Sequence, residues 1–241
     1  TISGNTISNN TATSSGGGFY FGGGTVTISG NTISNNTASS GSGGGICSSS
    51  SAVTISGNTI SNNTATSSGG GIYSSGGTVT ISGNTISNNT ATSSGGGFYF
   101  GGGTVTISGN TISNNTASSG SGGGICSSSS AVTISGNTIS NNTATSSGGG
   151  IYSSYAYWYY WSSAAGTISG NTISNNTASS DGGGIYFDGG TVTKNSLTRN
   201  SAKNASAVYC GGSSKDFTYN TIVGNKATDS SNTYTVYISS N

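Results

Sequence analysis

The sequence has almost no charge. Its 241 residues include 5 lysines and arginines and 4 acidic residues, and histidine, methionine and proline are missing. Nucleic acid, anionic membranes and acidic substrates are bound through clustered Lys and Arg, so a net charge of +1 predicts no nucleic-acid partner. No stretch approaches the roughly 18 apolar residues of a spanning helix, and we expect no membrane span.

Charged side chains are missing from most of the chain, and this absence argues against catalysis. Residues 1–180 contain no charged side chain, and the first acids are Asp181 and Asp188. General acid–base catalysis needs a group that titrates near the working pH. We interpret the two aspartates as a solvated pair in the loops of one repeat. The sequence therefore predicts no enzyme, no catalytic residue, no cofactor and no metal site.

What the sequence does have is a repeat. The string TISGNTISNNTA recurs in steps of 26 or 27 residues, with one longer step, and residues 1–75 and 80–154 are identical letter for letter. We predict a single domain over 1–241, with two identical three-rung blocks in 1–154, an aromatic insert in 155–166 and divergent rungs in 167–241. The copies begin at Thr1, Thr27, Thr54, Thr80, Thr106, Thr133 and Thr167.

Within a repeat, the apolar residues follow strand periodicity. Residues 25–28 alternate polar and apolar, corners follow at 30–31 and 35–36, and 44–47 form another short strand. A unit of 24–27 residues with three short strands and three corners cannot bury an apolar face alone and must stack on its copies. Gly, Ser, Thr and Asn are poor helix formers. The predicted fold is an all-β, right-handed parallel β-helix of about nine rungs, one of them longer.

Stacking places equivalent residues in columns about 4.8 Å apart. One aliphatic column runs through Ile7 and Ile33, and another through Phe19 and Ile46. The second residue of each Asn-Asn pair is predicted to form a structural ladder in which amides bond from rung to rung and tolerate a left-handed corner. This ladder comprises Asn10, Asn36, Asn63, Asn89, Asn115, Asn142, Asn176, Asn200 and Asn225.

The first residue of each Asn-Asn pair is predicted to point outward, because the divergent copies replace it with Arg199 and Gly224. These asparagines fit the N-glycosylation pattern, although corner geometry in a chain rich in Asn and Thr also explains the match. The candidate glycosylation sites are Asn9, Asn35, Asn62, Asn88, Asn114, Asn141 and Asn175 in the pairs, and Asn204 in the separate match Asn204-Ala205-Ser206.

The aromatic insert is the one break in regularity. Six aromatic residues in seven cannot all point into a narrow coil. They form either a loop that packs on the rod and on neighbouring molecules, or a face for sugar rings or another protein. The residues are Tyr155, Tyr157, Trp158, Tyr159, Tyr160 and Trp161.

Cysteine and threonine recur at fixed positions. Cys47 and Cys126 are three rungs apart, too far for a disulfide, and we interpret them and Cys210 as small fillers or surface thiols. Outward Thr-x-Thr pairs resemble those of ice-binding β-solenoids, but Ala52 and Ala131 interrupt them, and strand propensity is the alternative explanation. The pairs are Thr25 and Thr27, Thr78 and Thr80, Thr104 and Thr106, and Thr191 and Thr193.

Two short motifs alternate along the chain, Gly43-Gly44-Gly45-Ile46 and Ile33-Ser34-Asn35-Asn36. They resemble the GGA[ILV] and FxxN motifs of the polymorphic outer-membrane proteins and of β-helical adhesin-like proteins of bacteria and archaea. Glycine here replaces the alanine of the first motif, and isoleucine replaces the phenylalanine of the second. The resemblance implies a secreted, surface-exposed β-helix used in adhesion or as a stalk.

The predicted function is an extracellular or cell-surface fibre subunit, stalk or adhesin. Uncapped solenoid ends expose strand edges, so self-association into filaments is the expected partnership, with glycans or a neighbouring cell surface as other partners. Ice binding through the Thr-x-Thr face and carbohydrate binding are the alternatives.

Overall fold

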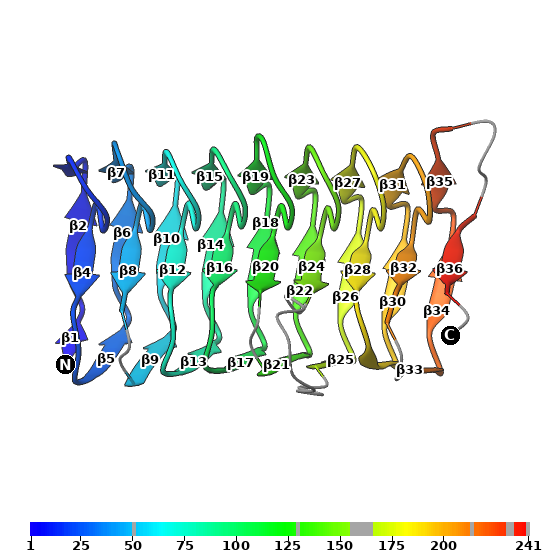
Figure 1. Ribbon diagram of the computed structural model, residues 1–241. Helices are drawn as coiled ribbons and strands as arrows, with labels where there is room; N and C mark the ends of the chain where they lie inside the picture. The colour runs from blue at the N-terminus through cyan, green and yellow to red at the C-terminus, as the bar shows by residue number, and fades with distance from the viewer. Residues whose placement is uncertain (50–51, 129–130, 155–165, 213–214, 230–233, 240–241) are drawn as a thin grey trace.

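A computed structural model shows the protein as a row of stacked coils (Figure 1). It describes residues 1–49, 52–128, 131–154, 166–212, 215–229 and 234–239. The strands in these residues form four parallel sheets of nine strands each, and the residues contain no helix. Neighbouring strands of a sheet come from successive repeats, so each repeat makes one coil. The predicted all-β parallel β-helix of about nine rungs is confirmed.

Sheet A starts each coil with the strand in which apolar and polar residues alternate. Its strands are β1 (Ile2–Ser3), β5 (Thr25–Ser29), β9 (Ala52–Ser56), β13 (Thr78–Ser82), β17 (Thr104–Ser108), β21 (Ala131–Ser135), β25 (Gly166–Ser169), β29 (Gly190–Thr193) and β33 (Lys215–Thr218).

Sheet B follows the first corner and carries the Thr-Ile-Ser segment. Its strands are β2 (Thr6–Ser8), β6 (Thr32–Ser34), β10 (Thr59–Ser61), β14 (Thr85–Ser87), β18 (Thr111–Ser113), β22 (Thr138–Ser140), β26 (Thr172–Ser174), β30 (Ser196–Thr198) and β34 (Thr221–Val223).

Sheet C corrects the prediction of three strands per repeat, because it adds a fourth. Each strand has two residues, too few to show alternation, and exists because equivalent residues of neighbouring coils pair with it. Its strands are β3 (Thr11–Ala12), β7 (Thr37–Ala38), β11 (Thr64–Ala65), β15 (Thr90–Ala91), β19 (Thr116–Ala117), β23 (Thr143–Ala144), β27 (Thr177–Ala178), β31 (Ser201–Ala202) and β35 (Lys226–Ala227).

Sheet D closes each coil after the glycine run. Its strands are β4 (Phe19–Phe21), β8 (Ile46–Ser48), β12 (Ile72–Ser74), β16 (Phe98–Phe100), β20 (Ile125–Ser128), β24 (Ile151–Ser154), β28 (Ile185–Phe187), β32 (Val208–Cys210) and β36 (Val236–Ile238).

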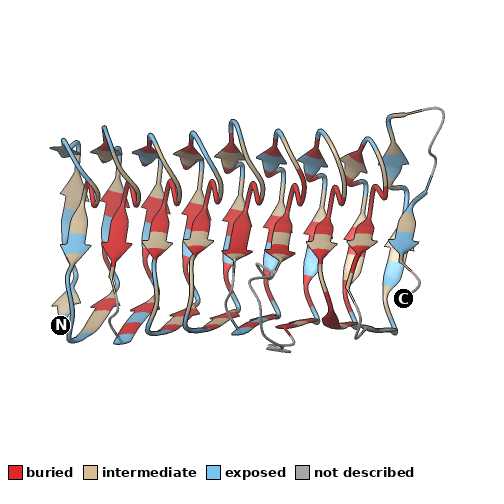
Figure 2. Ribbon diagram, viewed as in Figure 1, coloured by how far each residue is buried: buried red, intermediate tan, exposed pale blue. Residues whose placement is uncertain are grey.

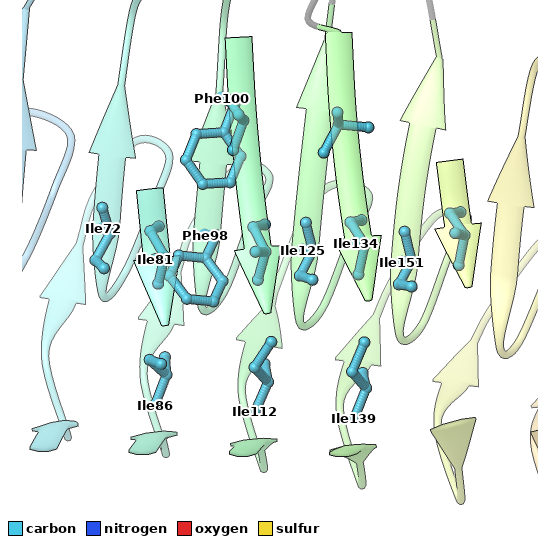
Figure 3. Packing of buried hydrophobic residues seen from close by; sticks show 14 of the residues in the cluster. Ile72, Ile81, Ile86, Phe98, Phe100, Ile112, Ile125, Ile134, Ile139 and Ile151 are labelled. Atoms are coloured by element: carbon cyan, nitrogen blue, oxygen red, sulfur yellow. The ribbon is translucent and has the colours of Figure 1, made fainter. Parts of the chain in front are cut away.

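The core is a bundle of apolar columns, as the sequence predicted. Strand pairing aligns Ile60 with Ile33 on one side and Ile86 on the other, without a change of register. Figure 3 shows Ile81 of sheet A, Ile86 of sheet B and Phe98 of sheet D pointing into the interior of the coil. Full burial of each such side chain stabilises the fold by roughly 1.5–3 kcal/mol. Burial is greatest in the inner coils and decreases at the first and last (Figure 2).

Candidate functional site: columns of equivalent side chains

The predicted asparagine ladder is confirmed at the corner between sheets B and C. The side chain of Asn89 is fully buried. Its Nδ2 donates to Ile60 O and to Asn115 Oδ1, each at 3.0 Å, and its backbone N–H donates to the same Oδ1 at 3.0 Å. Its own Oδ1 accepts from the backbone N and from Nδ2 of Asn63, each at 3.0 Å. Both donors and both acceptor sites of the amide are therefore satisfied within the protein.

A second asparagine ladder, which the sequence analysis did not identify, stands at the corner between sheets A and B. Asn84 Nδ2 donates to Ile55 O at 2.9 Å and to Asn110 Oδ1 at 3.0 Å. The signal was in the sequence, since this asparagine persists in the divergent copies as Asn195 and Asn220. The ladder comprises Asn5, Asn31, Asn58, Asn84, Asn110, Asn137, Asn171, Asn195 and Asn220.

The left-handed backbone lies one residue earlier than the ladder that was expected to supply it. Asn88 has φ 56°, and Arg199 has the same φ in a divergent rung. Only glycine, and to a lesser extent Asn and Asp, adopts this conformation at little cost. The first asparagine of each pair therefore makes the turn, while the second fills the ladder.

The candidate glycosylation sites divide into two groups. The first asparagines of the pairs, such as Asn88, are exposed, as predicted. Asn204 is different, because its Nδ2 donates to Asp181 Oδ1 at 3.0 Å and its own Oδ1 is buried. Glycosylation itself stays a prediction. The aromatic insert, Tyr155 to Trp161, lies outside the described residues.

The two sequence motifs meet in space. A Cβ added to Gly71, the third glycine of one rung, would lie 3.3 Å from Cγ of Asn89, the ladder residue of the next rung. A Cβ on Gly70 would lie 2.5 Å from Gly96 O and 2.6 Å from the carbonyl carbon of Thr90. The glycine run passes against sheet C of the next coil at backbone contact distance, so there is no room for a side chain and glycine is needed.

Comparison with protein families places the whole chain in one of them. The model of the right-handed β-helix region matches residues 1–112, 31–176 and 68–241 in overlapping segments. The chain belongs to the right-handed β-helix family. Comparisons with curated proteins and with solved structures gave no match. None of the described residues forms a helix long and apolar enough to cross a membrane.

This β-helix carries a column of aromatic side chains on the outer face of sheet D. Tyr186 stacks on Tyr209 with ring centroids 4.7 Å apart and an interplanar angle of 2°. Tyr152 and Tyr237 extend the stack on either side, each with ring centroids at 4.9 Å. Tyr152, Tyr186 and Tyr209 are half-buried, and Tyr237, in the last rung, is exposed at 36%. Sequence analysis did not predict the stacking.

Two cysteines occupy the tyrosine column, and both are fillers. Cys47 pairs with Tyr20 and Tyr73, and Cys126 is its equivalent three rungs on. Each has only 2% of its surface exposed. Burial raises the pKa of Cys126 to about 12 and that of Cys47 to about 11, although serine hydroxyls that bond to the sulfurs lower both pKa values in part. Cys210 points inward and is 1% exposed.

The free energy of unfolding is expected to be independent of these thiols below pH 9 and to fall between pH 9 and 12. The unfolded thiols ionise near 9.0, while the folded ones stay protonated up to about 11 and 12, so rising pH favours the unfolded chain. Denaturant titrations across this range should show a smaller fall for Cys47→Ala/Cys126→Ala. The tyrosines with raised pKa, such as Tyr73, contribute the remaining slope. Identical slopes for both proteins would contradict the assignment.

The outer face of sheet A presents threonine in one unbroken column and one broken column. The broken column runs through Thr25, Ala52, Thr78, Thr104 and Ala131, so alanine interrupts it as the sequence indicated. The unbroken column comprises Thr27, Thr54, Thr80, Thr106, Thr133, Thr167 and Thr191, and Asp216 takes the position in the last rung. Thr191 therefore aligns with the second threonine of the other pairs and Thr193 with Ser169, so the expected pair of Thr191 and Thr193 is out of register with the rest.

Charged side chains occur only beyond residue 180. Asp181 accepts a hydrogen bond from Ser180 Oγ at 2.9 Å as well as the one from Asn204. Lys203 and Asp229 form an ion pair at 3.7 Å beside an open surface hollow. The described residues contain no group of three or more Cys, Asp or Glu side chains that is arranged to hold a metal ion.

Proposed function

We propose that this β-helix is a structural element of the cell exterior or cell surface, used as a fibre subunit, stalk or adhesin, and that it is not an enzyme. The observation that carries the proposal is the uniformity of the rod. Coil after coil repeats the same two asparagine ladders and the same apolar columns. Residues 1–180 surround this core with an uncharged surface.

The hydrogen bonds between coils suit the rod to bearing load as a rigid body rather than to a movement that separates its coils. Each inner asparagine amide links three successive coils, because it donates to the coil before it and both donates to and accepts from its ladder neighbours. Buried networks in which every polar group is satisfied are rigid. Extracellular location and adhesive use follow the resemblance of the glycine and asparagine motifs to surface β-helices, and they belong to the proposal.

We further propose that a second copy of the chain pairs with the rod end to end. The strands of the first rung, β1–β4, and of the last rung, β33–β36, are the edge strands of the four sheets. The ladder gives these edges different character: in the first rung Asn10 donates to Asn36 and its Oδ1 is a ladder acceptor at the edge, while in the last rung Asn225 accepts from Asn200 and its Nδ2 donates back to Leu197 O and Val223 O. Ile238, at 46% exposure, leaves apolar surface at the second edge. Such edges pair readily with further strands.

Electron microscopy and light scattering over a concentration series test this proposal. The unchanged chain should give filaments, and Ile238→Lys should give single rods, because a charge on an edge strand opposes pairing. Ser140→Lys, on the outer face in the middle of the rod, is the matched control and should polymerise normally. An unchanged chain that stays monomeric at high concentration, without filaments, would refute the end-to-end assembly.

Ice binding is a second candidate, and the unbroken threonine column favours it. Adjacent rungs hold Thr80 and Thr106 in register on a parallel sheet, which gives a regular row of hydroxyl and methyl groups about 4.8 Å apart. Thermal hysteresis at millimolar protein, abolished by Thr106→Tyr, would support it. No hysteresis in the unchanged chain would eliminate it.

A further inference from the structure

Every rung of sheet D carries a tyrosine or a cysteine at the same position of its strand. The nine strands are in register there, so the positions form one continuous column along the rod. The column comprises Tyr20, Cys47, Tyr73, Tyr99, Cys126, Tyr152, Tyr186, Tyr209 and Tyr237.

The column contains an uninterrupted run of four tyrosines. From Tyr152 to Tyr237, successive ring centroids are 4.9, 4.7 and 4.9 Å apart, with interplanar angles of 18°, 2° and 21°. Parallel β pairing fixes this spacing, because it sets the distance between rungs. The faces of the inner rings lie against each other, so the rings cannot offer them to a sugar, and what solvent meets is the ring edges with their phenol groups.

We propose that this run, Tyr152 to Tyr237, is a site of oxidative cross-linking, where adjacent rungs are joined through dityrosine. The oxidant is of the haem peroxidase class with hydrogen peroxide. Each of two neighbouring phenols loses one electron and its proton, and the two phenoxyl radicals couple through ring carbons ortho to oxygen. Each joined carbon then passes its hydrogen to its own ring oxygen. One carbon–carbon bond forms, two hydrogen atoms leave, and one peroxide is reduced to two waters.

The surroundings of the run direct oxidation to the phenols. The neighbouring thiol, Cys126, is 2% exposed, and thiol oxidation proceeds through an accessible thiolate. Adjacent rings are already held within a few ångströms, so coupling within the rod competes well with coupling between molecules. Tyr219, at 83% exposure, is the side chain best placed for coupling between molecules and serves as the internal competitor.

The sequence makes the bridges easy to assign. Cleavage after Lys and Arg isolates Tyr209 in residues 204–215 and Tyr219 in residues 216–226, while Tyr237 falls in 227–241. A bridge from Tyr209 therefore joins 204–215 to 227–241 or to 1–194, while a bridge between Tyr152 and Tyr186 lies within 1–194. Fragment ions distinguish Tyr237 from Tyr234, whose ring is tilted by 55° against it.

The experiment treats the folded chain with a haem peroxidase and hydrogen peroxide at two protein concentrations, and maps the peptides by mass spectrometry. We expect bridges from 204–215 whose yield per chain does not change on dilution, and dityrosine fluorescence in the single-chain band of a denaturing gel. Tyr209→Phe keeps an aromatic ring in the stack and should abolish those bridges, while Tyr219→Phe should leave them intact. Bridges found only through Tyr219 and decreasing on dilution, or no bridges at all, would overturn the proposal.

Discussion

Replacing Asn89 with alanine should destabilise the rod by roughly 3–5 kcal/mol. The substitution leaves the Asn63 backbone N–H and Nδ2 without their shared acceptor, and it removes the donor to Ile60 O. These groups are buried, and each unsatisfied buried group costs about 1–3 kcal/mol. A small cavity in the corner adds to the loss. Chemical denaturation followed by circular dichroism measures the change.

Asn88→Gly is the matched control for that experiment. Asn88 is adjacent in sequence and of the same residue type, but it is exposed and left-handed at φ 56°. Gly224 already fills the equivalent position in the last rung, with φ 66°. Glycine adopts this backbone freely, so stability should change by less than about 1 kcal/mol. Equal losses in the two variants would show that the ladder hydrogen bonds do not stabilise the fold.

The parts of the fold that repeat could be predicted from the sequence. Self-alignment gave the number of coils, and the divergent copies identified which positions face inward. Leu197 and Ile222 still occupy the sheet B column, and Asn200 and Asn225 still occupy the ladder. Equivalent positions of stacked rungs require the same type of residue, so a pattern that is weak in one coil becomes clear when nine coils are aligned.

Features that depend on contacts between coils could not be predicted. The two-residue strand Thr37–Ala38 exists only through its pairing with neighbouring rungs. The distinction between Asn88 and Asn89 required the backbone, because two adjacent asparagines have opposite roles at one corner. The tyrosine stack was missed for a similar reason: alternation places Tyr186 outside, but only the rung spacing shows that its ring meets that of Tyr209.

Gly70→Ala should be at least as damaging as the loss of a ladder asparagine, at about 3 kcal/mol or more. The added methyl would lie 2.5 Å from Gly96 O and 2.6 Å from the carbonyl carbon of Thr90. Both are backbone atoms of the next coil, which cannot move without breaking the hydrogen bonds of the glycine run and of sheet C. The free energy of unfolding and the yield of folded chain should both fall.

Gly83→Ala is the control for Gly70→Ala, because it separates the stability lost through steric crowding from the stability lost through an unfavourable backbone conformation. Gly83 has φ +62°, and a Cβ there meets nothing within 4 Å, so the cost is limited to the left-handed backbone, about 1 kcal/mol. The chain itself tolerates Lys194 and Tyr219 at equivalent positions, with φ 56° and 57°. It replaces the middle glycine in the last two rungs, with Ser206 and then Tyr234, so Ser206 meets Tyr234 O in place of a glycine carbonyl. If both alanine variants lost the same stability, conformation alone would explain the glycines; we expect Gly70→Ala to lose at least twice as much as Gly83→Ala.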